Sequence, residues 1–155
     1  MDVGLMFGVI FAVIFIGFLL AFGTGYITNF MNLNSEATMK QQVNSLKFSV
    51  KSASNLAQGS IEKIKLIVPS GYKKVCFVDP EYSLSNPAGN WESSEFLISM
   101  ITKYKYNILI FGQDDLPEGD VIEKAKPYQN FCITSSRELI LRNTGAIVEI
   151  TLPEF

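Results

Sequence analysis

The longest uncharged run of the chain lies near its start and restricts the possible folds more than any other feature. From Val3 to Ser35 there is no Asp, Glu, Lys or Arg, and from Val3 to Phe22 there is no polar side chain. A helix over this second run would be about 30 Å long, which equals the hydrocarbon thickness of a bilayer. Backbone groups in lipid must be satisfied within the segment, which favours a helix. Residues 1–33 are therefore predicted to form a transmembrane anchor.

A cleavable secretory signal is the main alternative to a retained anchor. Such a signal begins with positive charge and has an apolar core of roughly 7–15 residues. Here the only early charge is Asp2, and the apolar run is longer. A buried core helix is a third interpretation, but a domain this small could hardly enclose one. We therefore predict that the segment is retained.

A second helical pattern follows over residues 34–59. Its apolar residues recur at alternating spacings of four and three, which predicts one apolar stripe on an amphipathic helix. Two interpretations stay open: the stripe pairs with helices of other copies, or it lies on a sheet of the same chain. Gly4 and Gly8 form a GxxxG pair that favours close helix approach. The residues of the stripe are Met39, Val43, Leu46, Val50, Ala53 and Ala57.

From residue 60 onward the pattern changes to short apolar runs separated by turn residues, which predicts strands. The fold class predicted is α+β: a long N-terminal helix, transmembrane and then amphipathic, followed by a small antiparallel β-rich head at 60–155 with one or two short helices. A short helix is expected after a cap at Ser93. Glycine last in Asn143-Thr144-Gly145 predicts a hairpin there. The strands are expected at 61–69 and 73–79 as one hairpin, and at 106–112, 129–135, 137–143 and 146–152, with 113–120 an acidic loop and 121–126 a short helix or edge segment.

The two cysteines, Cys76 and Cys132, each lie in the centre of a short apolar run. This match suggests neighbouring strands joined by a disulfide, which requires an oxidising compartment. Two buried free thiols are the alternative. Lys40, the basic residue nearest to the span, favours a cytoplasmic head instead, but it is distant. We predict a single-pass membrane or cell-surface protein with its head outside the cytoplasm.

Composition excludes several kinds of chemistry. The chain has no His and a net charge of −2, which removes His-based catalysis and gives no electrostatic basis for nucleic-acid binding. Asp114, Asp115, Glu118 and Asp120 form an acidic cluster without the ligand spacing of a calcium loop, so a solvated loop is favoured over a calcium site. We predict no catalytic residue, no cofactor and no metal site.

The long, apolar-then-amphipathic helix before a β-rich head with VCFV and FCIT strands and a final LRNTG hairpin resembles type IV pilin-like proteins, including small exported archaeal ones. The resemblance implies a helix that anchors the subunit in a membrane and then forms the core of a filament. The chain departs from the family at its start: it has no basic leader, and Leu5 stands where many bacterial pilins have an acid. Either Met1 is already the mature terminus, or this is an unprocessed anchor of pilin-like shape.

Two functions are therefore expected. The first is a non-enzymatic structural subunit that assembles with copies or other pilin-like subunits through its N-terminal helix. The second is a stalked binding or adhesion module, whose head captures a partner through the loops at 79–92 and 113–120. Tyr82 and Trp91 are the best candidates for such a partner-binding loop, because exposed loop aromatics often anchor interfaces.

Overall fold

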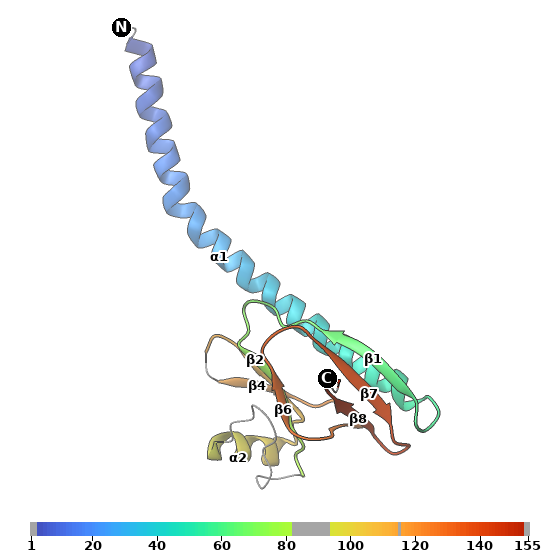
Figure 1. Cartoon of the computed structure of the whole chain (residues 1–155). Coiled ribbons are helices and arrows are strands. Elements are labelled where there is room, and N and C mark those ends of the chain that lie inside the picture. The colour runs from blue at the N-terminus through green and yellow to red at the C-terminus, as the bar shows by residue number, and fades with distance from the viewer. Residues whose placement is uncertain (1–2, 82–93, 115, 154–155) are drawn as a thin grey trace. The chain divides into compact units, whose positions relative to one another are not determined.

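The structure, a computed structural model, describes residues 3–81, 94–114 and 116–153; within helix α1 it describes the side chains of Gly4, 7–20 and 34–54. The chain divides into two units, Met1–Glu36 and Ala37–Phe155. Figure 1 shows the elements in chain order. They are α1 (Val3–Ser54), β1 (Ile61–Leu66), β2 (Lys74–Phe77), α2 (Glu95–Tyr104), β3 (Ile108–Phe111), β4 (Pro117–Asp120), β5 (Ala125–Pro127), β6 (Phe131–Ile133), β7 (Arg137–Asn143) and β8 (Val148–Thr151).

The transmembrane part of the predicted fold is wrong. In the part of the chain that the structure describes, no helix is long and apolar enough to cross a membrane. This finding overturns both the predicted anchor at 1–33 and the single-pass membrane location.

The β-rich part differs from the predicted antiparallel head, because it consists of two separate four-stranded sheets. Sheet A has the order β1-β7-β8-β5 and sheet B the order β4-β3-β2-β6. All pairs are antiparallel except β5 with β8, which is parallel. The predicted hairpin of β1 and β2 is wrong: β1 pairs with β7 and β2 pairs with β3 and β6. The predicted hairpin of β7 and β8 is confirmed, and Gly145 in its turn has φ of +99°.

Sheet B is buried on both faces, and the alternation of side chains along its strands assigns each residue to one face. Val75, Phe77 and Ile110 belong to the main core. Cys76, Leu109 and Cys132 face the other way and pack with Leu97 and Ile101 of helix α2. Helix α2 therefore covers one face of sheet B. Its N-cap is Ser94, which accepts a hydrogen bond from Leu97 N, one residue after the predicted cap at Ser93.

The second half of α1 supplies the opposite wall of the main core. Its residues from Ala37 to Ser54 lie beside β1 and β7 in Figure 1. Leu139 and Leu141 of β7 and Val148 of β8 are fully buried in the same core. Two polar contacts hold this half of the helix to both sheets: Ile67 N donates to Gln42 Oε1 at 3.2 Å, and Lys47 Nζ lies 2.7 Å from Asp120 Oδ2.

Asn143 closes the C-terminal end of α1. Its side chain is buried and donates to the carbonyls of Ala53 (3.0 Å) and Leu56 (2.8 Å), and it accepts from Gly145 N at 2.7 Å. The last carbonyls of a helix have no partner within the helix. One amide therefore satisfies two carbonyls at the helix end and the turn between β7 and β8.

We expect Asn143→Ala to lower the free energy of unfolding by about 2–3 kcal/mol, because three buried or half-buried hydrogen bonds are lost. Chemical denaturation under non-reducing conditions measures this. Thr144→Ala, which removes an exposed hydrogen bond to Ile147 O, is the neighbouring control and should cost under about 1 kcal/mol. Equal losses for the two variants would contradict the role given to Asn143.

Candidate functional site

The first half of α1 carries the largest group of exposed apolar side chains in the described structure. Each residue from Phe7 to Leu20 is exposed. The eleven large ones are 54–74 % exposed: Phe7, Val9, Ile10, Phe11, Val13, Ile14, Phe15, Ile16, Phe18, Leu19 and Leu20. Scattered exposed leucines are normal on a protein surface, but a continuous patch of this kind marks an interaction site.

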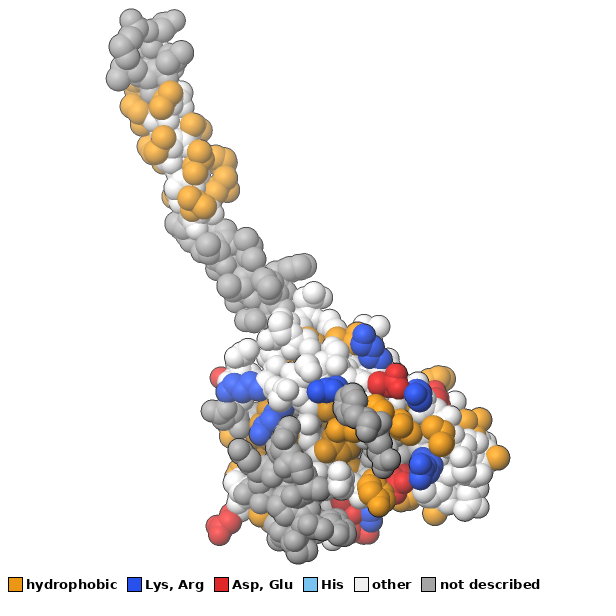
Figure 2. All heavy atoms as spheres, in the orientation of Figure 1, with side chains coloured by type: hydrophobic (Ala, Val, Ile, Leu, Met, Phe, Trp, Pro, Cys, Tyr) orange, Lys and Arg blue, Asp and Glu red, His pale blue; other side chains and the backbone are white. Residues whose placement is uncertain are grey.

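The apolar side chains surround this part of the helix on all sides. Successive residues of a helix are turned by about 100°, so Val13, Ile14, Phe15 and Ile16 together cover the whole circumference. Phe11 and Phe15 lie one turn apart, with ring centroids 6.4 Å from each other. Figure 2 shows orange side chains along the face of this segment that is seen. A helix that is hydrophobic all round is normally buried on all sides. A single flat partner surface would cover only one side of residues 7–20 and leave the other side chains exposed.

Gly4 and Gly8 lie in or next to this segment, which we name the apolar segment (residues 7–20). A Cβ atom added to either glycine would meet nothing within 4 Å. Their missing side chains therefore serve no packing purpose within the described structure. This leaves room for another backbone to approach at these two positions, as the GxxxG prediction expects.

The predicted stripe of the second helical pattern is divided by the structure. Met39, Val43, Leu46, Val50 and Ala53 are at most 4 % exposed and belong to the main core. Ala57 lies after the end of α1 and is exposed. Two interpretations of the stripe were left open above. The structure agrees with the second, in which the stripe lies on the sheets of its own chain. These side chains are therefore not available to a second copy in this fold.

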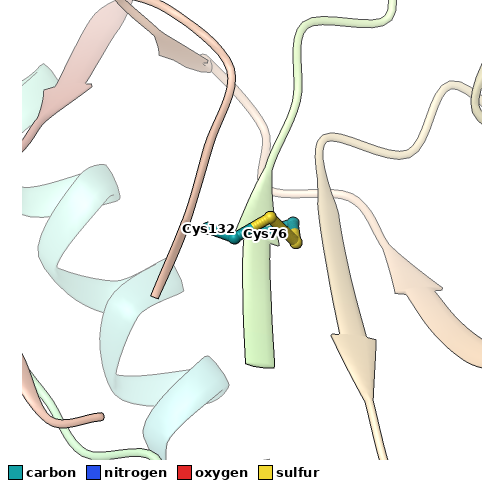
Figure 3. Close-up of a disulfide and its surroundings, with 2 residues drawn as sticks. All are labelled: Cys76 and Cys132. Carbon is teal, nitrogen blue, oxygen red and sulfur yellow. A yellow bond between two sulfur atoms is a disulfide. The ribbon is translucent and has the colours of Figure 1, made fainter. Parts of the chain in front are cut away.

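The predicted disulfide between Cys76 and Cys132 is confirmed. Cys76 of β2 and Cys132 of β6 are direct partners in the antiparallel register, with Cα atoms 4.0 Å apart. Figure 3 shows the bond between the two sulfur atoms joining these neighbouring strands. The cystine lies in the core that α2 covers, so it fixes sheet B and contributes no reactive thiol.

One ion pair was not foreseen from the sequence. The carboxylate of Asp79, only 5 % exposed, lies 2.9 Å from Lys126 Nζ, and its other oxygen accepts from Glu81 N. Asn130 Oδ1 accepts from Asp79 N at 2.8 Å. The hydrogen bond to Asp79 raises the pKa of Lys126 above its ordinary value, so Lys126 remains charged at neutral pH. The polar groups here satisfy one another and form a structural clamp.

The remaining predicted site residues have different outcomes. Tyr82 and Trp91 lie outside the described residues. Asp114 and Glu118 of the acidic cluster are exposed, and Asp120 is paired with Lys47. Among the residues described, no group of three His, Cys, Asp or Glu side chains is placed to hold a metal ion. Part of the cluster predicted as a loop forms the edge strand β4, where Tyr106 packs against Gly119.

Comparison with known proteins gives no further guidance, since no family model, curated protein or solved structure matches this chain. The pilin-like resemblance therefore stays a prediction.

Proposed function

We propose that this protein is a non-enzymatic structural subunit that assembles with copies of itself through the apolar segment of α1. The observation that carries the proposal is the exposure of eleven large apolar side chains on all sides of residues 7–20. Full burial of such a side chain is worth about 1.5–3 kcal/mol. Covering half of this surface would thus supply on the order of 10 kcal/mol against the cost of association.

Further features support self-association. Because the segment is apolar around its whole circumference, several neighbours are needed to cover it, which favours an assembly of many copies over a dimer. A second copy carries an identical apolar segment, so the two surfaces have the same chemistry, and every copy supplies one segment to the assembly. Gly4 and Gly8 provide positions of close approach between the helices. The pilin-like resemblance points to the same mode of assembly.

Sedimentation of the full-length chain in detergent-free, non-reducing buffer tests the proposal. The wild type should form a discrete species of many copies. Phe11→Glu/Phe15→Glu should raise the dissociation constant more than about 100-fold, because two apolar contacts are lost and two charges must be desolvated. Phe48→Glu is the control, since Phe48 lies on the second half of α1 and is 74 % exposed; it should assemble as the wild type does.

Gly8→Leu separates specific packing from unspecific aggregation. This substitution keeps the segment apolar, and a Cβ atom at position 8 meets nothing within 4 Å, so aggregation driven by hydrophobicity alone would persist. Specific helix packing would change in size or affinity. A wild type that stays monomeric in buffer, or that enters phospholipid vesicles as a monomer, would overturn the proposal. Binding through Tyr82 and Trp91 gains no support from the described residues and stays a separate prediction.

A further inference from the structure

Sheet A carries an open groove of about 550 Å³, a volume within the range of about 300–1,000 Å³ that small-molecule sites have. Two cross-strand pairs of the neighbouring strands β7 and β8 (Figure 1) line it, Ile140 with Thr151 and Arg142 with Glu149. Side chains alternate along a strand, so these four lie on the face opposite to Leu141, which belongs to the main core. The groove is therefore open to a ligand and is not part of that core.

The two charged residues of the groove have opposite charges and are not committed to other groups. Within the described parts of the chain, neither the Arg142 nor the Glu149 side chain has a hydrogen bond or an ion pair, although the register sets the two residues opposite each other. A guanidinium group only donates hydrogen bonds, and a carboxylate only accepts them. The groove thus offers a strong donor and a strong acceptor whose charges cancel.

An exposed aromatic ring lies beside these polar groups. Tyr128 lines the groove, and its side chain is 72 % exposed. Its backbone is fixed, because Tyr128 N donates to Ile150 O at 3.0 Å directly after β5, the strand that pairs with β8. Gln129 and Thr151 also line the groove and carry groups that both donate and accept. An exposed tyrosine alone is ordinary, but here it adjoins a set of uncommitted polar side chains.

We propose that this groove binds a neutral saccharide unit of a glycan. The C–H face of a pyranose ring packs on the ring of Tyr128, because the aromatic face is negative and the C–H hydrogens are slightly positive. A hydroxyl group donates one hydrogen bond and accepts others. Neighbouring sugar hydroxyls can therefore donate to Glu149 and accept from Arg142 at the same time.

Other classes of ligand match the groove less well. An anion would gain attraction from Arg142 and repulsion from Glu149, and a cation would gain the reverse. A purely apolar ligand would desolvate both charged groups without replacing their hydrogen bonds to water, which costs free energy. A neutral ligand rich in hydroxyl groups satisfies the donor and the acceptor together.

The proposed site goes beyond self-association and would gain from it. A single exposed sugar site is expected to be weak. Copies that assemble through the apolar segment would present many such sites together, and linked sites bind a surface with many glycans more tightly than one site does.

Saturation-transfer difference NMR on the full-length, non-reduced protein tests the inference with five probes: maltotriose, cellotriose, mannotriose, galactotriose and chitotriose. At least one of these should bind with a dissociation constant on the order of 1 mM or lower. Tyr128→Ala should raise that constant about tenfold, whereas Tyr128→Phe, which keeps the ring, should stay within about twofold of the wild type. Glu149→Ala should raise it about fivefold through loss of one hydrogen bond.

Phe48→Ala is the matched control, since Phe48 is an aromatic residue of equal exposure, 74 %, outside the groove; it should bind the saccharide as the wild type does. Circular dichroism checks that each variant is folded.

Transfer to a neutral trisaccharide that depends on Tyr128 and Glu149 supports the site. Three results would overturn it: no transfer to any of the five probes, transfer that persists unchanged in Tyr128→Ala, or tighter binding of trigalacturonate or triglycine than of every neutral saccharide. None of these results alters the sedimentation of the protein, so the proposed assembly through residues 7–20 stands or falls separately.

Discussion

Leu46→Asp is expected to abolish the folded state of the Ala37–Phe155 unit, whereas Phe48→Asp, two residues away on the same helix, should leave its stability within about 0.5 kcal/mol. Leu46 is 1 % exposed and lies in the main core, while Phe48 is 74 % exposed. Removing a buried leucine costs about 2–5 kcal/mol, and a buried unpaired carboxylate adds several more. The sum is comparable with the whole stability of a typical domain.

Far-UV circular dichroism and thermal unfolding of the two variants measure this difference. Leu46→Ala provides a milder step, with an expected loss of about 2–5 kcal/mol. The comparison also decides between the two interpretations of the stripe from Met39 to Ala53. If Leu46→Asp remained folded and changed only the size of the assembly, the stripe would contact neighbouring copies and the described core would be incorrect.

Loss of the disulfide is expected to produce the second large effect. The bond joins residues 56 positions apart, and closing a loop of that length in the unfolded chain corresponds to about 4 kcal/mol in the chain-entropy model. Cys76→Ala/Cys132→Ala should therefore lower the free energy of unfolding by about 4 kcal/mol. Denaturation with and without dithiothreitol provides the matched control.

The reductant should lower the stability of the wild type to that of the double variant and have no effect on the variant itself. Cys76 is fully buried and Cys132 is 6 % exposed, so reduction should proceed at the rate at which the core opens. A wild type whose unfolding midpoint does not respond to reductant after full equilibration would show that the bond contributes nothing to stability.

Local patterns predicted several elements correctly. The alternation of four and three from Met39 to Ala53 identified the buried face of α1, because helical spacing sets which side chains share a face. The central position of both cysteines in apolar runs identified the strands that pair. Asn143-Thr144-Gly145 identified the final hairpin, since a glycine at positive φ ends the turn.

The errors concern contacts between distant segments and strands with weak local signals. The β1 and β2 strands look like a hairpin because Pro69-Ser70-Gly71 separates them, yet each finds its partner elsewhere. Strand β4, with the sequence PEGD, lacks the β-branched and aromatic residues that favour strands, and it forms at an edge next to β3. The ion pair of Asp79 with Lys126 joins residues 47 positions apart, which no local pattern encodes.

For the candidate site too, local features could be predicted from the sequence, whereas contacts between distant segments could not. Composition alone identified residues 3–22 as exceptional, but it assigned them to lipid, because a run of uncharged residues gives no information about what covers it. A groove lined by the segment 128–131 and by residues of β7 and β8 was not foreseen, since these segments meet only in the folded chain.

The cystine also determines how the chain responds to cutting. Helix α2 and the strands β3, β4 and β5 all lie between Cys76 and Cys132 in the sequence. A protease that cleaves one peptide bond anywhere between the two cysteines therefore opens a covalent ring without separating the product into two molecules. On a gel, such a nicked subunit would run as one band until a reductant is added, and its two ends would remain joined through β2 and β6.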